Sequence, residues 1–268
     1  MKKLILATAA LVTLSFGGNV AQAADMPVKA MPVPVFSWTG CYVGVQVGYK
    51  WGRSKHTSAG STNGVPNDPD EAPAGQDITG WFNVNGAVGG GEAGCQYQWG
   101  TWLWGVEVDG SWSAAEGQAN HIPTLLGDGL SSNWISKTSE RWLVTARGRL
   151  GWAWDKWLWY VTGGGAWTGL DIATFNAFQP TNHAIEQHTR AGWVVGFGTE
   201  YHVHNNWSVK AEALYLDFGT FRAFDNVLPS CTNTSGNCTN RDVDLSEFIF
   251  RVGMNYRFEW YTPVVAKY

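Results

Sequence analysis

The sequence predicts an all-β protein, an eight-stranded antiparallel up-and-down transmembrane β-barrel with short periplasmic turns and long extracellular loops. Three observations predict this fold. Apolar and polar residues alternate in eight segments, the connections alternate between very short and very long, and tryptophans gather at the segment ends. Outside the N-terminal segment no apolar run approaches the ~18 residues of a transmembrane helix, so strands are expected to cross the membrane.

The alternation is clearest in the last segment, residues 244–258. Successive side chains of a strand point to opposite faces, so the two parities of the segment describe two faces. The apolar face is expected to contact lipid, and the face with arginines and an amide is expected to line the lumen. The apolar face consists of Phe248, Phe250, Val252, Met254, Tyr256 and Phe258. The lumen face consists of Ile249, Arg251, Gly253, Asn255 and Arg257.

The same split occurs in seven upstream segments, and their connections alternate in length. Short turns are expected around Gly100, Asp155 and Asn205, on the periplasmic side. Long loops are expected on the exterior, where proline, serine, threonine, asparagine and glycine are common. The sequence predicts these loops at roughly 52–78, 115–139, 169–190 and 219–243.

The tryptophans mark both membrane interfaces. Pairs such as Trp102 and Trp112 are ten residues apart, which is about 25 Å along the membrane normal in a tilted strand. This distance matches the apolar band of a membrane. A soluble core would instead place tryptophans in the middle of strands. The loop ends hold Trp51, Trp81, Trp112, Trp142, Trp167 and Trp193, and the turn ends hold Trp99, Trp102, Trp104, Trp152, Trp154, Trp157, Trp159 and Trp207.

The N-terminus reads as a secretion signal, with two lysines, an apolar core and a small-x-small site that ends at Ala23. Residues 1–23 are therefore predicted to be a signal peptide. Residues 24–37 contain three prolines and are interpreted as a periplasmic lead-in, because proline disfavours ladder hydrogen bonds. The barrel is expected to occupy residues 38–268.

The inward parities carry a nearly balanced set of five acids and six bases. Buried charges persist only when matched, and the interior of an eight-stranded barrel is just wide enough to be filled by its own side chains. We therefore expect a paired network that fills the lumen, with an open channel as the alternative. The predicted network is Lys50, Glu92, Glu107, Asp109, Arg147, Arg149, Glu200, Lys210, Glu212, Arg251 and Arg257.

No enzyme is predicted. A candidate nucleophile set, His202, His204, Ser208 and Glu200, flanks a periplasmic turn, whereas lipopolysaccharide lies in the outer leaflet, and no nucleophile elbow is present. The other histidines fall in the expected loops without the spacing of a zinc site, and haem contact is the alternative for them. No metal and no cofactor are expected. These loop histidines are His56, His121, His183 and His188.

Four cysteines suit an exported protein in an oxidising compartment. Cys231 and Cys238 are seven residues apart in the fourth expected loop, and we predict a small disulfide hairpin there. Cys41 and Cys95 have outward parity near the periplasmic ends of neighbouring strands. They either pair or face the membrane as apolar thiols.

Several stretches together resemble the alphaproteobacterial outer-membrane immunogenic proteins, which are opacity-like small barrels also described as porin-family proteins. The resemblance covers essentially the whole predicted barrel. It implies an eight-stranded outer-membrane barrel and a surface antigen, with haemin binding or porin-like activity ascribed to some members. The stretches are residues 37–44 (SWTGCYVG), 105–109 (GVEVD), 147–151 (RGRLG), 160–164 (YVTGG), 206–212 (NWSVKAE), 216–219 (LDFG) and 253–258 (GMNYRF).

Together these features predict a structural surface protein of the outer membrane, a surface antigen that supports envelope integrity and has a side-chain-filled lumen. The alternatives are a narrow porin-like channel and a haem-binding surface receptor. Expected partners are outer-membrane lipid, lipopolysaccharide and the barrel-assembly machinery. A net charge of −4 without a basic cluster gives no reason to expect nucleic-acid binding.

Overall fold

The computed structural model describes residues 36–60, 74–122, 134–178, 183–224 and 240–258. The predicted signal peptide with its cleavage site at Ala23, and the predicted pair Cys231 and Cys238, lie outside these residues. Within the described ranges, no helix is long and apolar enough to cross a membrane.

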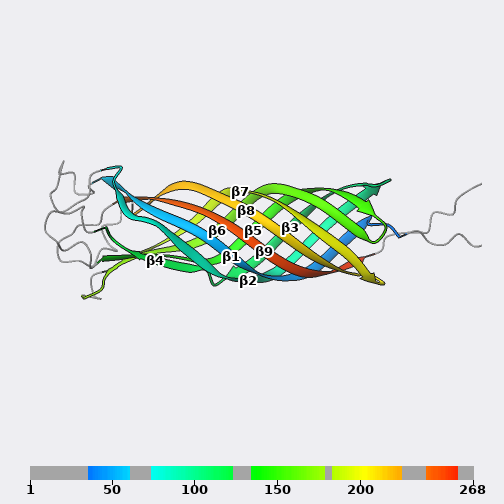
Figure 1. The fold of residues 1–268 in the computed structure, drawn as a ribbon, viewed down its shortest axis with the longest axis horizontal. Coiled ribbons are helices and arrows are strands. Elements are labelled where there is room, and N and C mark those ends of the chain that lie inside the picture. The colour runs from blue at the N-terminus through cyan, green and yellow to red at the C-terminus, as the bar shows by residue number, and fades with distance from the viewer. Residues whose placement is uncertain (1–35, 61–73, 123–133, 179–182, 225–239, 259–268) are drawn as a thin grey trace, which may run out of the picture. The chain divides into compact units, whose positions relative to one another are not determined.

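The described chain forms a closed ring of antiparallel strands that run obliquely along the barrel (Figure 1). Strands pair with their neighbours along the chain, except that β3 and β4 both lie between β2 and β5, and β1 also pairs with β9, which closes the ring. The strands are β1 (Gly40–Gly60), β2 (Asp77–Trp99), β3 (Trp102–Ser113), β4 (Glu116–Asn120), β5 (Trp134–Trp154), β6 (Trp157–Asn176), β7 (His183–His204), β8 (Trp207–Ala223) and β9 (Asn240–Phe258).

Strands β3 and β4 are two parts of one barrel strand, so the nine segments make a ring of eight. Both segments lie between β2 and β5. At the break, the Ala114 amide donates to the Ala87 carbonyl at 3.0 Å, and the Glu140 amide donates to the Ala115 carbonyl at 2.9 Å. Bonds to both neighbours therefore continue across the break, and the predicted eight-stranded barrel is confirmed.

The three periplasmic turns lie where the sequence predicts them. Two residues join β2 to β3, β5 to β6 and β7 to β8. The first residue of each turn has a positive φ, at 63° for Gly100, 51° for Asp155 and 50° for Asn205. Glycine, asparagine and aspartate tolerate this conformation better than other residues, which explains why these types stand at the turns.

The predicted long loops are wrong in extent, because the strands continue well beyond the outer tryptophans. Strand β1 continues to Gly60 and β6 to Asn176, through residues that the sequence assigned to loops. Beyond the membrane the outward face contacts water, so it no longer needs apolar residues, and the apolar side chains turn inward. Leu170 and Ile172, for example, are fully buried inside the barrel.

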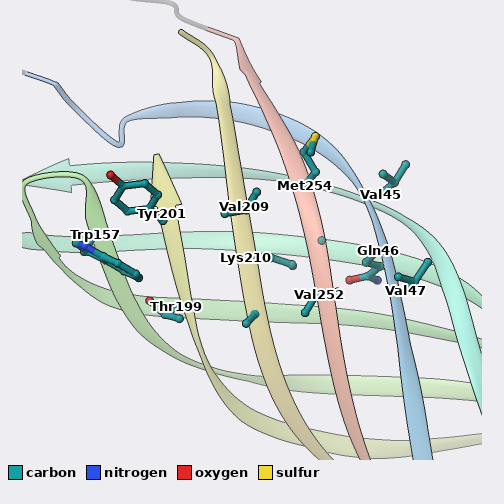
Figure 2. A pocket seen from close by; sticks show the side chains of 12 residues that line it. Val45, Gln46, Val47, Trp157, Thr199, Tyr201, Val209, Lys210, Val252 and Met254 are labelled. Atoms are coloured by element: carbon teal, nitrogen blue, oxygen red, sulfur yellow. The ribbon is translucent and has the colours of Figure 1, made fainter. Parts of the chain in front are cut away.

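The predicted faces are confirmed in all eight barrel strands. Outward residues such as Val106 and Val161 are 64% and 57% exposed, whereas the inward set is buried. The outward side chains of β1, β9, β8 and β7 form part of a shallow apolar groove of about 660 Å³ on the barrel wall, where Val45 and Met254 project from neighbouring strands (Figure 2). This apolar wall is the surface that a bilayer covers.

Arginine at Val106 or Val161 is expected to lower the free energy of unfolding in bilayers by ~2–4 kcal/mol, because the guanidinium would enter the hydrocarbon region. Arginine at Thr162 is expected to have a different cost, because this buried side chain faces the lumen and donates to the Gly148 carbonyl at 2.9 Å. Urea unfolding in lipid vesicles measures these costs, with Val106→Leu as the control. Near-zero costs at both outward sites would contradict the assigned faces.

Candidate functional site in the barrel lumen

Arg147 is at the centre of the lumen and is surrounded by three carboxylates from two strands, β3 and β8. Its guanidinium pairs with Glu107, with Asp109 at 3.0 Å and with Glu212 at 2.8 Å. Glu107 lies directly opposite Arg147 in the β3 and β5 pairing, whereas Glu212 reaches it across the barrel from β8. Side chains that cross the axis in this way fill the lumen.

Arg251 extends the same network from β9. Its guanidinium is 2.9 Å from Asp109 and 2.7 Å from Glu212, so it shares both acids with Arg147. Arg149 pairs with Glu107 at 3.1 Å and with Glu200 at 3.4 Å. Glu107, Asp109 and Glu212 thus each contact more than one base, which offsets the cost of removing these charges from water.

Two tyrosines extend the network through their rings and hydroxyls. The Arg149 guanidinium lies 3.7 Å from the centre of the Tyr160 ring, and the Tyr160 hydroxyl donates to Glu212 at 3.2 Å. The Tyr42 hydroxyl donates to Glu107 at 2.6 Å. Tyr42 and Tyr160 have the inward parity of their strands, but parity alone gives no reason to expect them as partners of the charges.

Lys210 joins β8 to the opposite wall by pairing with Glu92 and by lying 3.4 Å from Glu107. Glu200 accepts hydrogen bonds from Ser208 and, at 3.2 Å, from the Asn255 amide. The structure therefore brings nine of the predicted charged residues into one connected cluster, which we call the central network. Its members are Glu92, Glu107, Asp109, Arg147, Arg149, Glu200, Lys210, Glu212 and Arg251.

Lys50 belongs to a separate group. Its ammonium pairs with Glu140 and lies 2.8 Å from Glu247, and all three side chains are fully buried. The sequence prediction missed both acids. Glu247 has the inward parity of Arg251, so its position in the lumen could have been predicted from the sequence. Glu140 has the parity of the outward Trp142, but a bulge between them turns it inward, and no parity count reveals a bulge.

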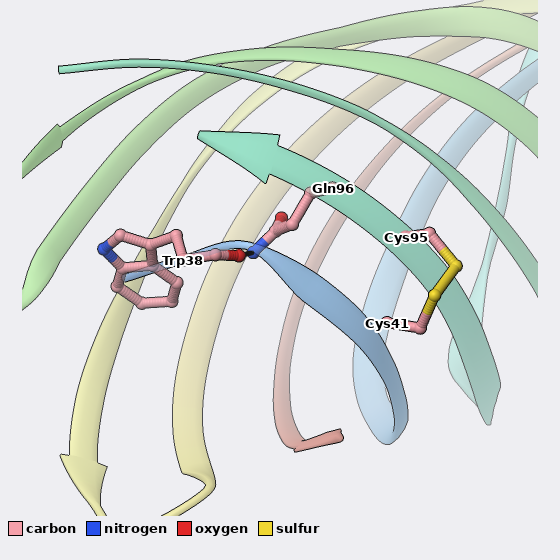
Figure 3. The surroundings of a disulfide bond; sticks show 4 residues. All are labelled: Trp38, Cys41, Cys95 and Gln96. Carbon is pink, nitrogen blue, oxygen red and sulfur yellow. Dashed lines mark hydrogen bonds between the residues drawn. A yellow bond between two sulfur atoms is a disulfide. The ribbon is translucent and has the colours of Figure 1, made fainter. Parts of the chain in front are cut away.

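The periplasmic end of the lumen is filled by the segment before β1. Trp38 is fully buried there and packs with Leu103 and Leu158. Its amide donates to Gln98 at 2.7 Å. Its carbonyl accepts a bond from Gln96 at 2.9 Å, and Figure 3 shows these two residues. This cluster of Phe36, Trp38, Leu103, Ala153, Leu158 and Tyr160 is the periplasmic plug.

Arg257, the eleventh predicted network residue, lies at this plug. Its guanidinium is 4.3 Å from the Trp38 ring and 5.1 Å from the Phe36 ring, and it donates to the Ser37 carbonyl at 3.1 Å. A guanidinium over an aromatic face is attracted by the ring quadrupole. In these contacts Arg257 fixes the N-terminal segment in the mouth of the barrel.

An apolar layer lies in the lumen on the extracellular side of the central network, at the level of the Lys50 group. It consists of branched and aromatic side chains from β5, β6, β7, β8 and β9, most of them fully buried. The described lumen thus has a mostly apolar plug, a charged middle, and a mostly apolar outer layer that also contains the Lys50 group. The outer layer includes Leu143, Leu170, Ile172, Val194, Leu214, Leu216, Phe221, Val243, Leu245 and Ile249.

Cys41 and Cys95 form a disulfide, which decides between the two possibilities that the sequence left open. The two residues lie directly opposite each other in the β1 and β2 pairing, next to the periplasmic plug (Figure 3). The bond therefore ties the first strand to the second where the N-terminal segment enters the barrel.

Non-reducing peptide mapping of the exported protein is expected to recover one linked species with Cys41 and Cys95. A second linked species, with Cys231 and Cys238, is still a prediction from the sequence alone. The same peptide mapping tests it. Recovery of Cys41 as a free thiol would contradict the structure, and a link between the two pairs would contradict both assignments.

Two of the histidines expected in loops lie in or beside strands, at the extracellular end of the barrel. His56 on β1 is fully buried and its Nε2 is 3.0 Å from the Thr138 hydroxyl. His121 follows β4, and its Nε2 is 2.9 Å from the Ser136 hydroxyl. Both lie near the buried Arg241, whose guanidinium donates to Ser136.

The other two expected loop histidines belong to β7. His183 begins the strand, and His188 lies five residues further along it. The His188 Nε2 is 3.1 Å from a Glu186 oxygen, and its ring packs 5.7 Å from that of Phe221. The strands that continue beyond the membrane thus carry residues that the sequence assigned to loops. Among the described residues, no group of histidine, cysteine and acids has the arrangement of a metal site.

Burial and the neighbouring Arg241 charge lower the pKa of His56 from 6.5 to about 3. Burial, Arg241 and His56 lower the pKa of His121 to about 2. Folded protein keeps both rings neutral, whereas unfolded protein binds protons below pH 6.5. The free energy of unfolding is therefore expected to fall from pH 6.5 toward pH 3, by ~1.4 kcal/mol per pH unit for each histidine.

Urea unfolding at several pH values measures this slope. His56→Gln is expected to reduce this slope by the contribution of one histidine. Equal slopes in wild type and His56→Gln would contradict the neutral, buried state of His56.

The candidate nucleophile set does not present an accessible hydroxyl. Ser208 is fully buried in the lumen and its hydroxyl donates to Glu200, which is itself part of the central network. The His202 ring packs 4.0 Å from the Phe36 ring, against the periplasmic plug. These residues therefore have structural contacts in the barrel.

The chain is similar to known outer-membrane proteins. A family model described as the outer membrane protein beta-barrel domain matches residues 8–258. The 31 kDa outer-membrane immunogenic protein of Brucella melitensis is 32% identical over 267 residues, with 96% of this chain and 100% of the relative covered. The 25 kDa outer-membrane immunogenic protein of the same organism is 26% identical over 262 residues, with 96% and 99% covered.

Among solved structures, the outer membrane protein OprG from Pseudomonas aeruginosa aligns with a TM-score of 0.49 and 14% identity, over 82% of this chain and 97% of that chain. The family match and the 31 kDa relative both extend over nearly the whole chain. They confirm the family resemblance and the outer-membrane location that the sequence predicts. The chain belongs to the outer membrane protein beta-barrel domain family and is a surface protein of the bacterial outer membrane.

Proposed function

We propose that the protein is a structural component of the outer-membrane surface, with a lumen closed by its own side chains. The observation that carries this proposal is the burial of the central network, whose members are at most 5% exposed. Water that filled a pore would reach these side chains. The periplasmic plug and the apolar outer layer add two further barriers in the described part of the chain.

The structural role follows from the connectivity of the network. Ion pairs link β2, β3, β5, β7, β8 and β9 across the axis, so the wall is held from inside as well as by its backbone ladder. The extracellular parts of the strands extend beyond the membrane, where a surface antigen is exposed. The names of the immunogenic relatives support this part of the proposal.

Planar-bilayer conductance of the refolded protein tests the closed lumen. We expect no stable conductance above the lipid background, and at most brief, small events. A stable conductance comparable to that of a large porin would overturn the proposal and favour the channel.

A haem-binding receptor remains the other candidate from the sequence. His56 and His121 do not support it, because their rings are directed at hydroxyls inside the barrel. A haemin titration monitored by absorbance tests this candidate separately.

A further inference from the structure

A groove of about 380 Å³ indents the outer wall of the barrel near the outer tryptophans. It crosses four strands, β2, β1, β9 and β8, which are neighbours in the ring. We call it the interface groove. Its lining consists of Trp51, Gly52, Arg53, Asn83, Asn85, Tyr215, Ser246, Glu247 and Phe248.

The groove has an apolar side and a polar side. Each side is a row of residues that are register partners on neighbouring strands, and the two rows are adjacent along the strands. Trp51, Phe248 and Tyr215 are register partners in the row nearer the membrane. The next row outward pairs Arg53 with Ser246 on one side and with Asn83 on the other. The aromatic row belongs to the outer belt, so the polar row lies at the depth of lipid headgroups.

The accessible charge of the groove is positive. Arg53 is exposed, and no carboxylate of the described residues forms an ion pair with it. Glu247, the acid in the lining, has a fully buried side chain and lies 2.8 Å from the Lys50 ammonium. The next lysine along β1, Lys55, is already 2.7 Å from Asp77.

These features match an anionic, amphipathic ligand. A guanidinium binds phosphate oxygens through paired, charge-assisted hydrogen bonds, and amide or hydroxyl side chains bind the sugar hydroxyls beside it. The aromatic row offers a surface for the acyl chains, which run toward the membrane interior. We propose that the interface groove binds a phosphorylated glycolipid of the outer leaflet, with its phosphate on Arg53 and its acyl chains along Trp51 and Phe248.

Native mass spectrometry of the refolded protein in detergent, titrated with lipid A, tests this site. We expect wild type to retain lipid A, and we expect Arg53→Gln to weaken binding about 10-fold, since charge-assisted hydrogen bonds are lost. Arg141→Gln is the matched control, because Arg141 is also exposed near the outer belt but pairs with Asp171 at 3.2 Å. This control is expected to bind as wild type does.

Three lipids separate the sources of binding: lipid A, its dephosphorylated form and phosphatidylglycerol. Only lipid A is expected to bind tightly, because it combines a phosphate with a sugar headgroup. Equal binding of the dephosphorylated lipid would overturn the role of Arg53, and equal binding of phosphatidylglycerol would overturn the glycolipid assignment. Unchanged binding by Arg53→Gln would overturn the site itself.

Arg53→Gln is expected to fold normally, since the side chain points out of the barrel. Heat-modified migration in gel electrophoresis checks this for every variant. The proposal does not depend on the closed lumen, so the conductance experiment and the lipid experiment can fail independently.

Discussion

Replacing Arg147 with alanine is expected to lower the free energy of unfolding by ~3–5 kcal/mol. The substitution leaves Glu107, Asp109 and Glu212 buried with one partner fewer each. Arg251 still contacts two of these acids, but it cannot fill the volume that Arg147 occupied on the opposite wall. Urea unfolding in lipid vesicles measures the loss.

Arg141→Ala is the control for this experiment. Its side chain is about half exposed and forms an ion pair with Asp171, and exposed pairs contribute only ~0–1 kcal/mol. Arg149→Ala is expected to resemble Arg147→Ala, since Arg149 also pairs with two buried acids. If Arg147→Ala were as mild as Arg141→Ala, the central network would not stabilise the barrel.

Conductance of Arg147→Ala adds a second measurement. The periplasmic plug and the apolar outer layer remain in this variant. Loss of one arginine is therefore expected to lower the free energy of unfolding strongly but to raise the conductance of the lumen only slightly. A small, unstable conductance is compatible with this expectation. A large and steady conductance would show that the charged middle alone closes the lumen.

The wall of the barrel could be predicted from the sequence because the alternation of apolar and polar residues within each strand shows which side chains face lipid and which face the lumen. Alternation is a local property, and lipid imposes the same requirement on every outward side chain, so Phe250, Val252 and Met254 were all assigned correctly. The tryptophan positions likewise depend only on the membrane thickness. The two-residue turns followed from residues that tolerate a positive φ.

The limits of the strands could not be predicted in the same way. Beyond the membrane the outward face meets water, and the apolar residues that remain, such as Leu170 and Val243, turn inward. A search for outward apolar residues therefore ends each strand too early. The same error placed His56 in a loop, although its parity matches that of Lys50.

Partners across the lumen depend on the ring as a whole. Parity places Lys50 inside, but the choice of Glu140 and Glu247 as its partners depends on a bulge and on the closure of β1 against β9. The position of Trp38 is another example, because its contacts come from residues about 60 or more positions away in the sequence.

Trp38→Ala is the second substitution with a large expected effect, a loss of ~3–5 kcal/mol in the free energy of unfolding. The indole is fully buried and packs with Leu103 and Leu158, and Arg257 lies over its ring. Alanine leaves a cavity at the mouth and removes the cation–π contact of Arg257. Trp104→Ala is the control, since this indole is exposed on the outer wall, where it contacts lipid and the Tyr97 ring but not the lumen.

The conductance of Trp38→Ala separates the layers of the lumen. The central network lies directly beyond the plug, so we expect this variant to remain closed while it loses stability. The double variant Trp38→Ala with Arg147→Ala is expected to show more frequent openings than either single variant, because two consecutive layers are then breached. If Trp38→Ala alone conducted steadily, the plug would be the gate of a channel and the side-chain-filled lumen would be wrong.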